Sequence, residues 1–426
     1  MNTTTGPAYG LFRGTRARSW EQLFLRIMRS ISLPESSYEK LEGHYAAIAE
    51  LLTDPTDPEL KDLYIFPQGS VQTRTLVRPL PGAEADVDAV AFKSDGTSLT
   101  PRELLDRLLA ELEARARTQG DVTRKRRCVT VSYADKDLPA HVDVTPAVPS
   151  AGNTSKDGTG PLVVPDYPSN EMKPTNPKDF AQWVMSVSKV PFPLEAETTR
   201  MAEAAAKAEV EPMPDHKEIV AMDPLRLAIK LCKRHRDLYA RRSNCADHQP
   251  ISVLITTLVG KAYLTVAAAA RANQRSFTML EAIQAIVDRM PHEFDEAPPM
   301  AREWRLENPR RSDENFAEKW NVDPKYAAVF DAWHANLKWT LALGLEQFAD
   351  RGAFEQEVGV ALGIDSRLAT HAYLTAAAKA GDAMPGLSDV LAKRLHDGER
   401  AVSTLLGLAA SAPTRAQEPT ETDRLG

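Results

Sequence analysis

Apolar residues recur at helical spacing near the start of the chain. Trp20, Leu23, Phe24 and Ile27 share one helical face, and Pro34 ends the pattern because proline cannot continue a helix. A second amphipathic pattern covers residues 38–52. The first 55 positions therefore predict two consecutive helices.

Between residues 64 and 148, the pattern changes to one in which apolar and polar residues alternate. The alternation covers residues 86–92, 128–133 and 141–148, and it is typical of strands with one buried face. A leucine-rich helical pattern separates the first two of these segments, over residues 101–117. This part of the chain predicts a mixed α/β core.

The remainder of the chain predicts mostly helices. Residues 150–178 are rich in Gly, Pro, Ser, Asn and Thr, which indicates an irregular loop. Residues 210–217 contain two prolines and suit an exposed insertion, and residues 411–426 lack apolar periodicity, so a disordered tail is expected there. Helices are predicted over residues 223–239, 251–271, 278–290, 326–348, 367–380 and 387–408.

Charge and cysteine content narrow the setting of the protein. The formal net charge of −7 gives no broad basic field, so stable nucleic-acid binding is not expected, although basic residues cluster at 124–127 and 230–236. Three cysteines in 426 residues favour a reducing compartment. No apolar leader is evident and no apolar run approaches a membrane-spanning length, so we expect a soluble, cytoplasmic protein without a membrane partner.

Three aspartates in the predicted strands point to a reaction. Asp86 and Asp88 are two residues apart, so both side chains project from the same side of a strand. Asp143 lies in another strand, and if the two strands are neighbours the three carboxylates converge. Converging carboxylates repel each other unless cations neutralise them, and Mg²⁺ or Mn²⁺ suits such oxygen ligands. Two such ions clamp the attacking and leaving oxygens of a phosphoryl displacement.

A glycine-serine turn precedes the aspartates. Gly69 allows the backbone to approach a phosphate closely, and the Ser70 hydroxyl with nearby N–H groups can hold triphosphate oxygens. Alone, an Asp-x-Asp pair is typical of a solvated strand and a Gly-Ser pair of a turn. Their order, followed by a third strand aspartate, predicts nucleotidyl transfer from a nucleoside triphosphate.

These residues carry a family resemblance. The chain resembles the cGAS/DncV-like nucleotidyltransferases (CD-NTases) of bacterial CBASS antiphage systems. Gln68-Gly69-Ser70 with Thr75 is similar to the family's nucleotide-binding turn, and Asp86, Asp88 and Asp143 are similar to its metal ligands. The resemblance implies catalysis with two Mg²⁺ ions.

The helical half resembles the family as well. Residues 229–237 are similar to a helix whose lysine contacts the donor triphosphate; both Lys230 and Lys233 lie there, and Lys233 fits the commoner pattern. Ser252 begins a segment similar to the next helix, whose serine contacts the same phosphates. Asn308-Pro309 and the segment 314–320 also resemble a part of the family's C-terminal lobe.

The resemblance implies an α+β fold. It has a polymerase-β-like nucleotidyltransferase core with a mixed β-sheet, an N-terminal helical spine and a C-terminal helical lobe, and the active site lies in the cleft between them. Residues 15–180 are predicted to form the core with the spine, residues 181–410 the helical lobe, and residues 411–426 the tail.

The implied enzyme condenses NTPs, ATP among them, into a cyclic di- or trinucleotide second messenger for antiphage defence. A downstream effector is then reached through the cyclic nucleotide. The alternative is a nucleotidyltransferase that makes linear oligonucleotides or modifies RNA or protein, and a non-catalytic nucleotide sensor is a further one. Neither the bases nor the linkages can be derived from the sequence.

Three further features are less specific. Cys232, His235, Cys245 and His248 offer four zinc-type ligands, with burial in the core as the alternative for the first two. His141 faces the same side as Asp143 and is interpreted as a neighbour of the site rather than a base. In many operons of the family the cyclase's C-terminus is conjugated, so the terminal Gly426 is a candidate site for a ubiquitin-transfer-like partner, or else an ordinary chain end.

Overall fold

The computed structural model describes residues 15–115, 121–136, 138–150, 154–196, 223–296, 303–343 and 351–364. The helices predicted over 367–380 and 387–408, the insertion at 210–217 and the tail that ends in Gly426 lie outside the described residues. Those expectations stay predictions.

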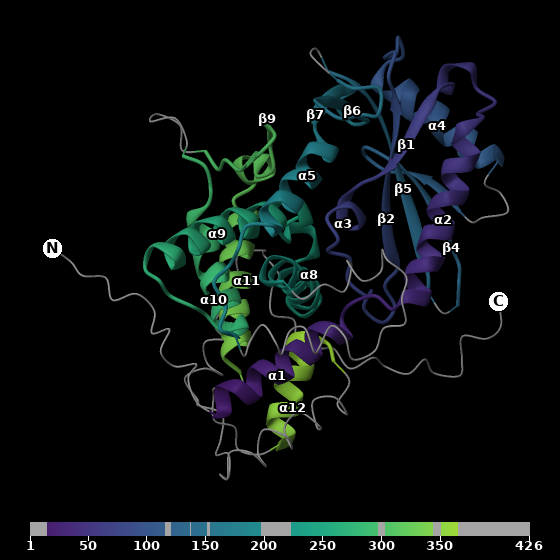
Figure 1. The fold of residues 1–426 in the computed structure, drawn as a ribbon. Helices are drawn as coiled ribbons and strands as arrows, with labels where there is room; N and C mark the ends of the chain where they lie inside the picture. Colours follow the sequence, from purple (N-terminus) through teal and green to yellow (C-terminus); the bar gives the residue numbers. More distant parts are fainter. Residues whose placement is uncertain are drawn as a thin grey trace, which may run out of the picture.

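A mixed β-sheet forms one half of the molecule (Figure 1). Its strands follow the order β1 (Leu63–Pro67), β2 (Ala85–Lys93), β5 (Ala140–Pro149), β4 (Val129–Tyr133) and β3 (Val122–Arg124). The central pair, β2 and β5, is parallel, and its neighbours are antiparallel. Asp88 pairs with Asp143 across β2 and β5, which confirms that the two acidic strands are neighbours.

Two helices cover one face of this sheet. Helices α2 (Glu35–Thr53) and α4 (Pro101–Arg115) bury Leu41 and Leu105 in one core with Val87 and Val142. Because side chains alternate along a strand, Asp86 and Asp88 point to the opposite face. The apolar half of the alternation thus holds the sheet on its helices and leaves the acidic half facing the other way.

The loop expected over residues 150–178 was wrong in part, because two strands form there. Strand β6 (Leu162–Asp166) pairs with β5, and among the described residues β7 (Glu171–Thr175) pairs only with β6. Pro165 and Pro174 weaken the strand pattern in the sequence. Proline is tolerated in an edge strand, because the missing N–H is not needed by a further neighbour.

Helices form the other half of the molecule (Figure 1). Asp223 and Thr278 cap two of them by accepting hydrogen bonds from backbone N–H groups of the first turn. A short hairpin of β8 (Glu307–Asn308) and β9 (Arg311–Asn315) follows the first four helices. The helices are α5 (Pro177–Ser188), α8 (Pro224–Ser243), α9 (Ser252–Ala272), α10 (Met279–Arg289), α11 (Lys325–Ala342) and α12 (Arg351–Leu362).

Helix α9 corrects the expectation that no apolar run approaches a membrane-spanning length. An 18-residue window of this 21-residue helix has a mean hydropathy of 1.7, and by length and composition the helix could cross a membrane. It is the one helix of this kind within the described ranges. Its neighbours are α5, α8 and α10, and 61% of its apolar window is buried inside the protein. Burial among other helices accounts for its composition.

The first helix packs away from its neighbour in sequence. Helix α1 (Thr15–Ser30) places Trp20, Phe24 and Ile27 in the core of the helical half, whereas α2 packs on the sheet. Helix α5 also packs in the helical core, through Phe180 and Trp183. The α+β architecture with a helical lobe is confirmed, and the division of domains at residue 180 stays a prediction.

Candidate active site

A cleft of about 1390 Å³ lies against the acidic face of the sheet. Its walls come from both halves of the molecule: β2, β5 and the turn before α3 (Gly69–Gln72) on one side, and α8, α9 and the β8–β9 hairpin on the other. The volume exceeds the usual range for a site that holds one small ligand. Every predicted site residue except Lys230 lines this cleft.

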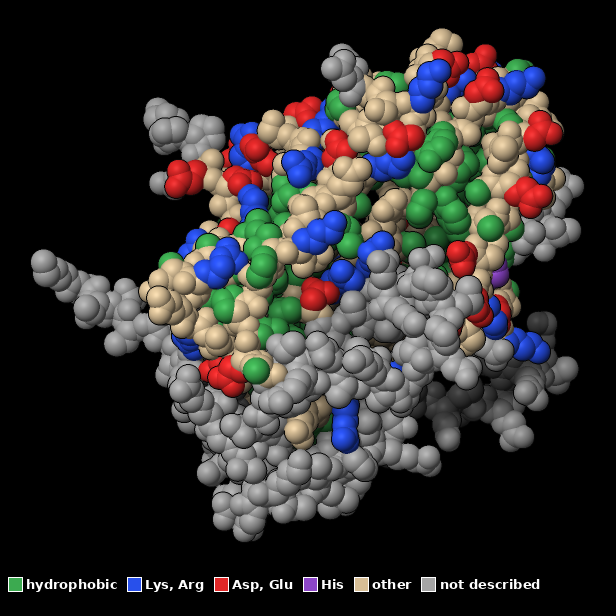
Figure 2. Space-filling view, in the orientation of Figure 1, with side chains coloured by type: hydrophobic (Ala, Val, Ile, Leu, Met, Phe, Trp, Pro, Cys, Tyr) green, Lys and Arg blue, Asp and Glu red, His purple; other side chains and the backbone are tan. Residues whose placement is uncertain are grey.

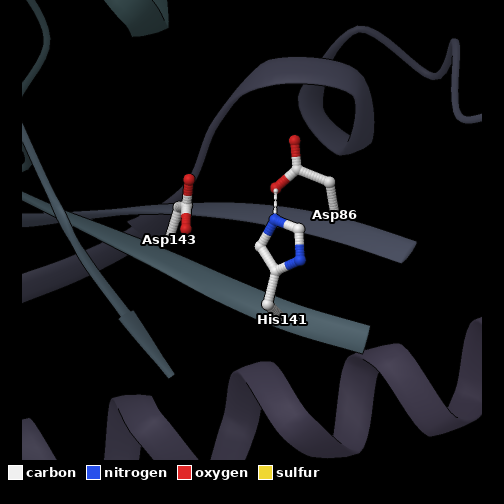
Figure 3. A group of neighbouring side chains, drawn as sticks. All are labelled: Asp86, His141 and Asp143. Atoms are coloured by element: carbon white, nitrogen blue, oxygen red, sulfur yellow. Dashed lines mark ion pairs between the residues drawn. The ribbon is translucent and has the colours of Figure 1, made fainter. Parts of the chain in front are cut away.

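The three aspartates meet at the floor of the cleft. Asp86 and Asp88 come from β2, and Asp143 lies opposite Asp88 on β5. Ligand atoms of Asp86, Asp143 and the adjacent His141 all lie within 4.8 Å of one another (Figure 3). Oxygen donors at this spacing suit a hard divalent cation.

Electrostatics also fit the cluster to cations. Burial, together with the charges of Asp86 and Asp143, raises the pKa of Asp88 to about 8. Such repulsion is relieved when a divalent cation lies between the carboxylates. The residues present therefore fit a metal site, and Asp86, Asp88 and Asp143 would hold the ions.

His141 bridges two acidic side chains beside the cluster. Its Nε2 lies 3.2 Å from Asp86 Oδ1 (Figure 3). Its Nδ1 lies 2.9 Å from Glu84 Oε2. The hydrogen bond to Asp86 raises the pKa of His141 against the opposing effect of burial. This placement agrees with the interpretation of His141 as a neighbour that orients Asp86. Glu84, which directly precedes β2, was not selected from the sequence, because only its contact with His141 in the folded protein places it beside the site.

Asp143 has two partners that the sequence reasoning did not select. Thr130 Oγ1 donates to Asp143 Oδ1 at 2.5 Å, and Lys125 Nζ lies 3.1 Å from both carboxylate oxygens. Partial burial lowers the pKa of Lys125, but the charge of Asp143 and its hydrogen bond outweigh this and raise it. Thr130 belongs to the predicted strand alternation and Lys125 to the basic run. Both patterns were recognised in the sequence, but neither indicated a contact with Asp143.

The glycine-serine turn is fitted to the same carboxylates. Gly69 has a φ of +62°, and a Cβ at this position would overlap the Asp88 carboxylate. The backbone N–H of Gln68 donates to the Asp88 carbonyl oxygen at 2.9 Å, which fixes the turn on β2. The N–H of Thr75 donates to the Ser70 carbonyl oxygen at 2.9 Å. Glycine is therefore needed here for both its conformation and its lack of a side chain.

Helix α8 separates the two candidate lysines. Lys233 lines the cleft, and its Nζ donates to Thr75 Oγ1 at 2.9 Å. Lys230 is fully buried outside the cleft, where its Nζ lies 3.5 Å from Ser32 Oγ. Burial lowers the pKa of each lysine to about 8. The geometry favours Lys233 for a role in the cleft.

This difference predicts opposite effects of two matched substitutions. If the cleft binds an NTP, Lys233→Met should raise the KM for that NTP about 10- to 100-fold, because the change removes a buried cation from the cleft wall. Lys230→Met should leave KM within about twofold, since this side chain does not line the cleft. Steady-state kinetics of both variants, with thermal unfolding as the control for folding, test the assignment. A larger rise in KM for Lys230→Met would contradict it.

Ser252 begins α9 at the cleft wall. Its Oγ accepts a hydrogen bond at 3.0 Å from Arg236 Nη1, which also donates to the Pro250 carbonyl oxygen at 3.0 Å. Arg236 lines the cleft too, although only its basic cluster, and not this residue, was selected from the sequence. The start of a 21-residue helix with a hydroxyl and a guanidinium group is a favourable place for a phosphate.

The four zinc-type residues do not gather. His235 is fully buried and its Nε2 pairs with Thr340 Oγ1 at 2.9 Å, while His248 Nε2 pairs with Asp323 Oδ2 at 3.0 Å. Cys232 and Cys245 are buried in the helical core. Within the part of the chain that the structure describes, the group of metal-type ligands that comes together is at Asp86, His141 and Asp143.

Comparison with known proteins agrees with a nucleotide-binding role for the cleft. Residues 19–187 match the Second Messenger Oligonucleotide or Dinucleotide Synthetase domain, SMODS. Over this segment the chain is similar to the CD-NTase family of second-messenger synthetases. It is a nucleotidyltransferase that makes cyclic nucleotide second messengers.

Two relatives illustrate the match over most of the chain. A c-di-GMP synthase of Roseivirga ehrenbergii is 23% identical over 321 residues, which cover 74% of this chain and 77% of the relative. The structure of Bradyrhizobium diazoefficiens CdnG in complex with GTP covers 85% of this chain and 98% of its own, at 22% identity and a TM-score of 0.61. This likeness supports a CD-NTase fold.

Proposed function

We propose that this protein joins NTPs by two-metal nucleotidyl transfer in the cleft, with Asp86, Asp88 and Asp143 as the metal ligands. The observation that carries the proposal is the meeting of these carboxylates with Lys233 and the Gly69 turn in one cavity. When bound, two Mg²⁺ or Mn²⁺ ions activate the attacking hydroxyl and neutralise charge on the leaving pyrophosphate. Thr130 and His141 hold the orientation of Asp143 and Asp86.

The remaining residues bind and orient the donor triphosphate. Backbone N–H groups of the turn at Gly69 and Ser70, which line the cleft, face its oxygens. Lys233 supplies a cation from the opposite wall, held by Thr75. Ser252 and the first turn of α9 extend this anionic subsite, with Arg236 beside them. Gln68 Nε2, 3.4 Å from Thr145 Oγ1, supports the turn on β5.

The product of this reaction is a cyclic di- or trinucleotide. A cleft lined by both acidic and basic residues, rather than a long basic groove, suits a short product over a polymer. Figure 2 shows acidic and basic side chains interspersed on one face of the molecule, in keeping with the net charge of −7. Because the Bradyrhizobium protein was seen with GTP and the Roseivirga relative is a c-di-GMP synthase, GTP is tested first, together with ATP. The messenger acts in the cytoplasm on an effector of antiphage defence.

Incubation with all four NTPs and Mg²⁺ tests the product. We expect a nucleotide that survives phosphatase, because a cyclic product has no terminal phosphate, and mass spectrometry then gives its size and bases. Omitting one NTP at a time identifies the required bases. A product that phosphatase degrades completely would indicate linear synthesis and contradict the cyclic proposal.

A further inference from the structure

In the turn between β3 and β4, three successive basic residues each form an ion pair with a different acidic side chain. Lys125 contacts Asp143, and Arg126 forms a two-pronged ion pair with Asp166 of β6 at 2.6 and 2.7 Å. All three basic residues line the cleft. The third, Arg127, reaches across it, with Nη2 3.5 Å from an acidic oxygen of the short helix 318–321.

Lys125 occupies the face of Asp143 on which a cation would bind. Its Nζ lies at the same distance, 3.1 Å, from both carboxylate oxygens, so it shares the lone pairs that a metal ion needs. The Thr130 hydroxyl already donates a hydrogen bond to one of these oxygens, Asp143 Oδ1. An ammonium group is a compact cation and can therefore neutralise Asp143 by itself.

The side chain of Lys125 can leave this place while its backbone stays. The side chain is 47% exposed, and its four-carbon stem reaches into the cleft. The backbone is fixed by the Arg126 ion pair to Asp166, whose side chain is fully buried, and by the hydrogen bond of 2.8 Å from Lys125 N to the Cys128 carbonyl oxygen. Movement is thus confined to the ammonium arm.

We propose that Lys125 is an internal counter-cation of the metal site. In the nucleotide-free enzyme it neutralises Asp143 and competes with free divalent cations. When an NTP binds together with its cation, the Lys125 ammonium group leaves Asp143 and contacts the phosphate oxygens of the nucleotide instead. Lys125 is therefore a positioning residue that makes metal binding depend on nucleotide. This inference rests on the proposed role of Asp143 as a metal ligand.

The exchange predicts effects of opposite sign in one variant. Lys125→Met should tighten Mn²⁺ binding without nucleotide roughly three- to tenfold, because the competing cation is lost. The same variant should weaken binding of a non-hydrolysable GTP analogue with Mn²⁺ by a similar factor, since a phosphate partner is lost. Free Mn²⁺ is measured by electron paramagnetic resonance, and nucleotide binding by calorimetry.

Lys40→Met is the matched control, because Lys40 Nζ also pairs with an aspartate, Asp135, at 2.9 Å but lies outside the cleft. Both affinities should be unchanged in this variant. Unchanged Mn²⁺ affinity in Lys125→Met, in a protein where Asp143→Asn weakens it, would overturn the inference and leave the proposed metal site intact. Equal Mn²⁺ affinity of wild type and Asp143→Asn would overturn both.

Discussion

Asp88→Asn should reduce nucleotide condensation on the order of 10³-fold or more, while the protein stays folded. The amide keeps the size of the carboxylate but loses the charge that a divalent cation requires. Asp86→Asn should have the same effect, because both carboxylates line the cleft and the charge of Asp86 acts directly on Asp88. Product formation by mass spectrometry, with circular dichroism for the fold, gives the result. Near wild-type turnover in either variant would remove the metal-ligand assignment.

The stability of the Asp88→Asn variant supplies a second readout. The pKa of Asp88 is raised from 3.8 to about 8, so the native state resists its ionisation and loses stability as pH rises from about 4 to about 8. Asparagine removes this penalty. In metal-free buffer at pH 8 the variant should therefore have a higher Tm than wild type, and the difference should shrink toward pH 4. Asp95→Asn is the control, since Asp95 is exposed and pairs only with Lys93 among the described residues.

Gly69→Ala should lower turnover by about 100-fold or more, because the new methyl group would push the Asp88 carboxylate out of the cluster. The left-handed backbone adds a cost in folding free energy of roughly 1–2 kcal/mol. Steady-state turnover and thermal unfolding measure the two effects separately.

Gly82→Ala isolates the backbone part of that effect. Gly82 also has a positive φ, +75°, but nothing lies within 4 Å of the position of its Cβ. It should lose stability to a similar extent and keep most of its activity. Equal losses of activity in both variants would mean that strain alone, and not the contact with Asp88, explains the need for Gly69.

The central part of the site could be predicted because its residues belong to short sequence patterns, a strand alternation and a glycine-serine turn. Alternation in β2 and β5 fixed the common face of Asp86, Asp88 and Asp143, and the Gly69 turn lies 17 positions before Asp86 in the sequence. The register of β2 on β5 and the position of α8 are set by tertiary packing, and local sequence patterns could not predict them. The choice between Lys230 and Lys233 depends on which side of α8 faces the cleft, and this follows from its packing against the other helices.

Features that depend on contacts between distant segments escaped prediction. The pairing of Lys125 with Asp143 requires the β3–β4 turn to fold back over β5. Strands β6 and β7 form around prolines, because β7 is an edge strand and needs few ladder hydrogen bonds. Helix α9 was recognised as a helix, but the burial of most of its apolar face, which accounts for its composition, depends on packing in the assembled lobe.

The packing of α1 has a consequence for the order in which the protein is completed during synthesis. Trp20 Nε1 donates to the Leu341 carbonyl oxygen at 3.1 Å, and the indole ring packs edge-on against Phe354. These partners are separated from Trp20 by 321 positions or more. At a ribosomal rate of about 5–20 residues per second, α1 waits roughly 15–60 s for them. The sheet and α2 can assemble long before this, whereas α1 docks in the helical half only after Leu341 and Phe354 have been synthesised. A growing chain therefore has its acidic cluster in place without the lobe that completes the enzyme.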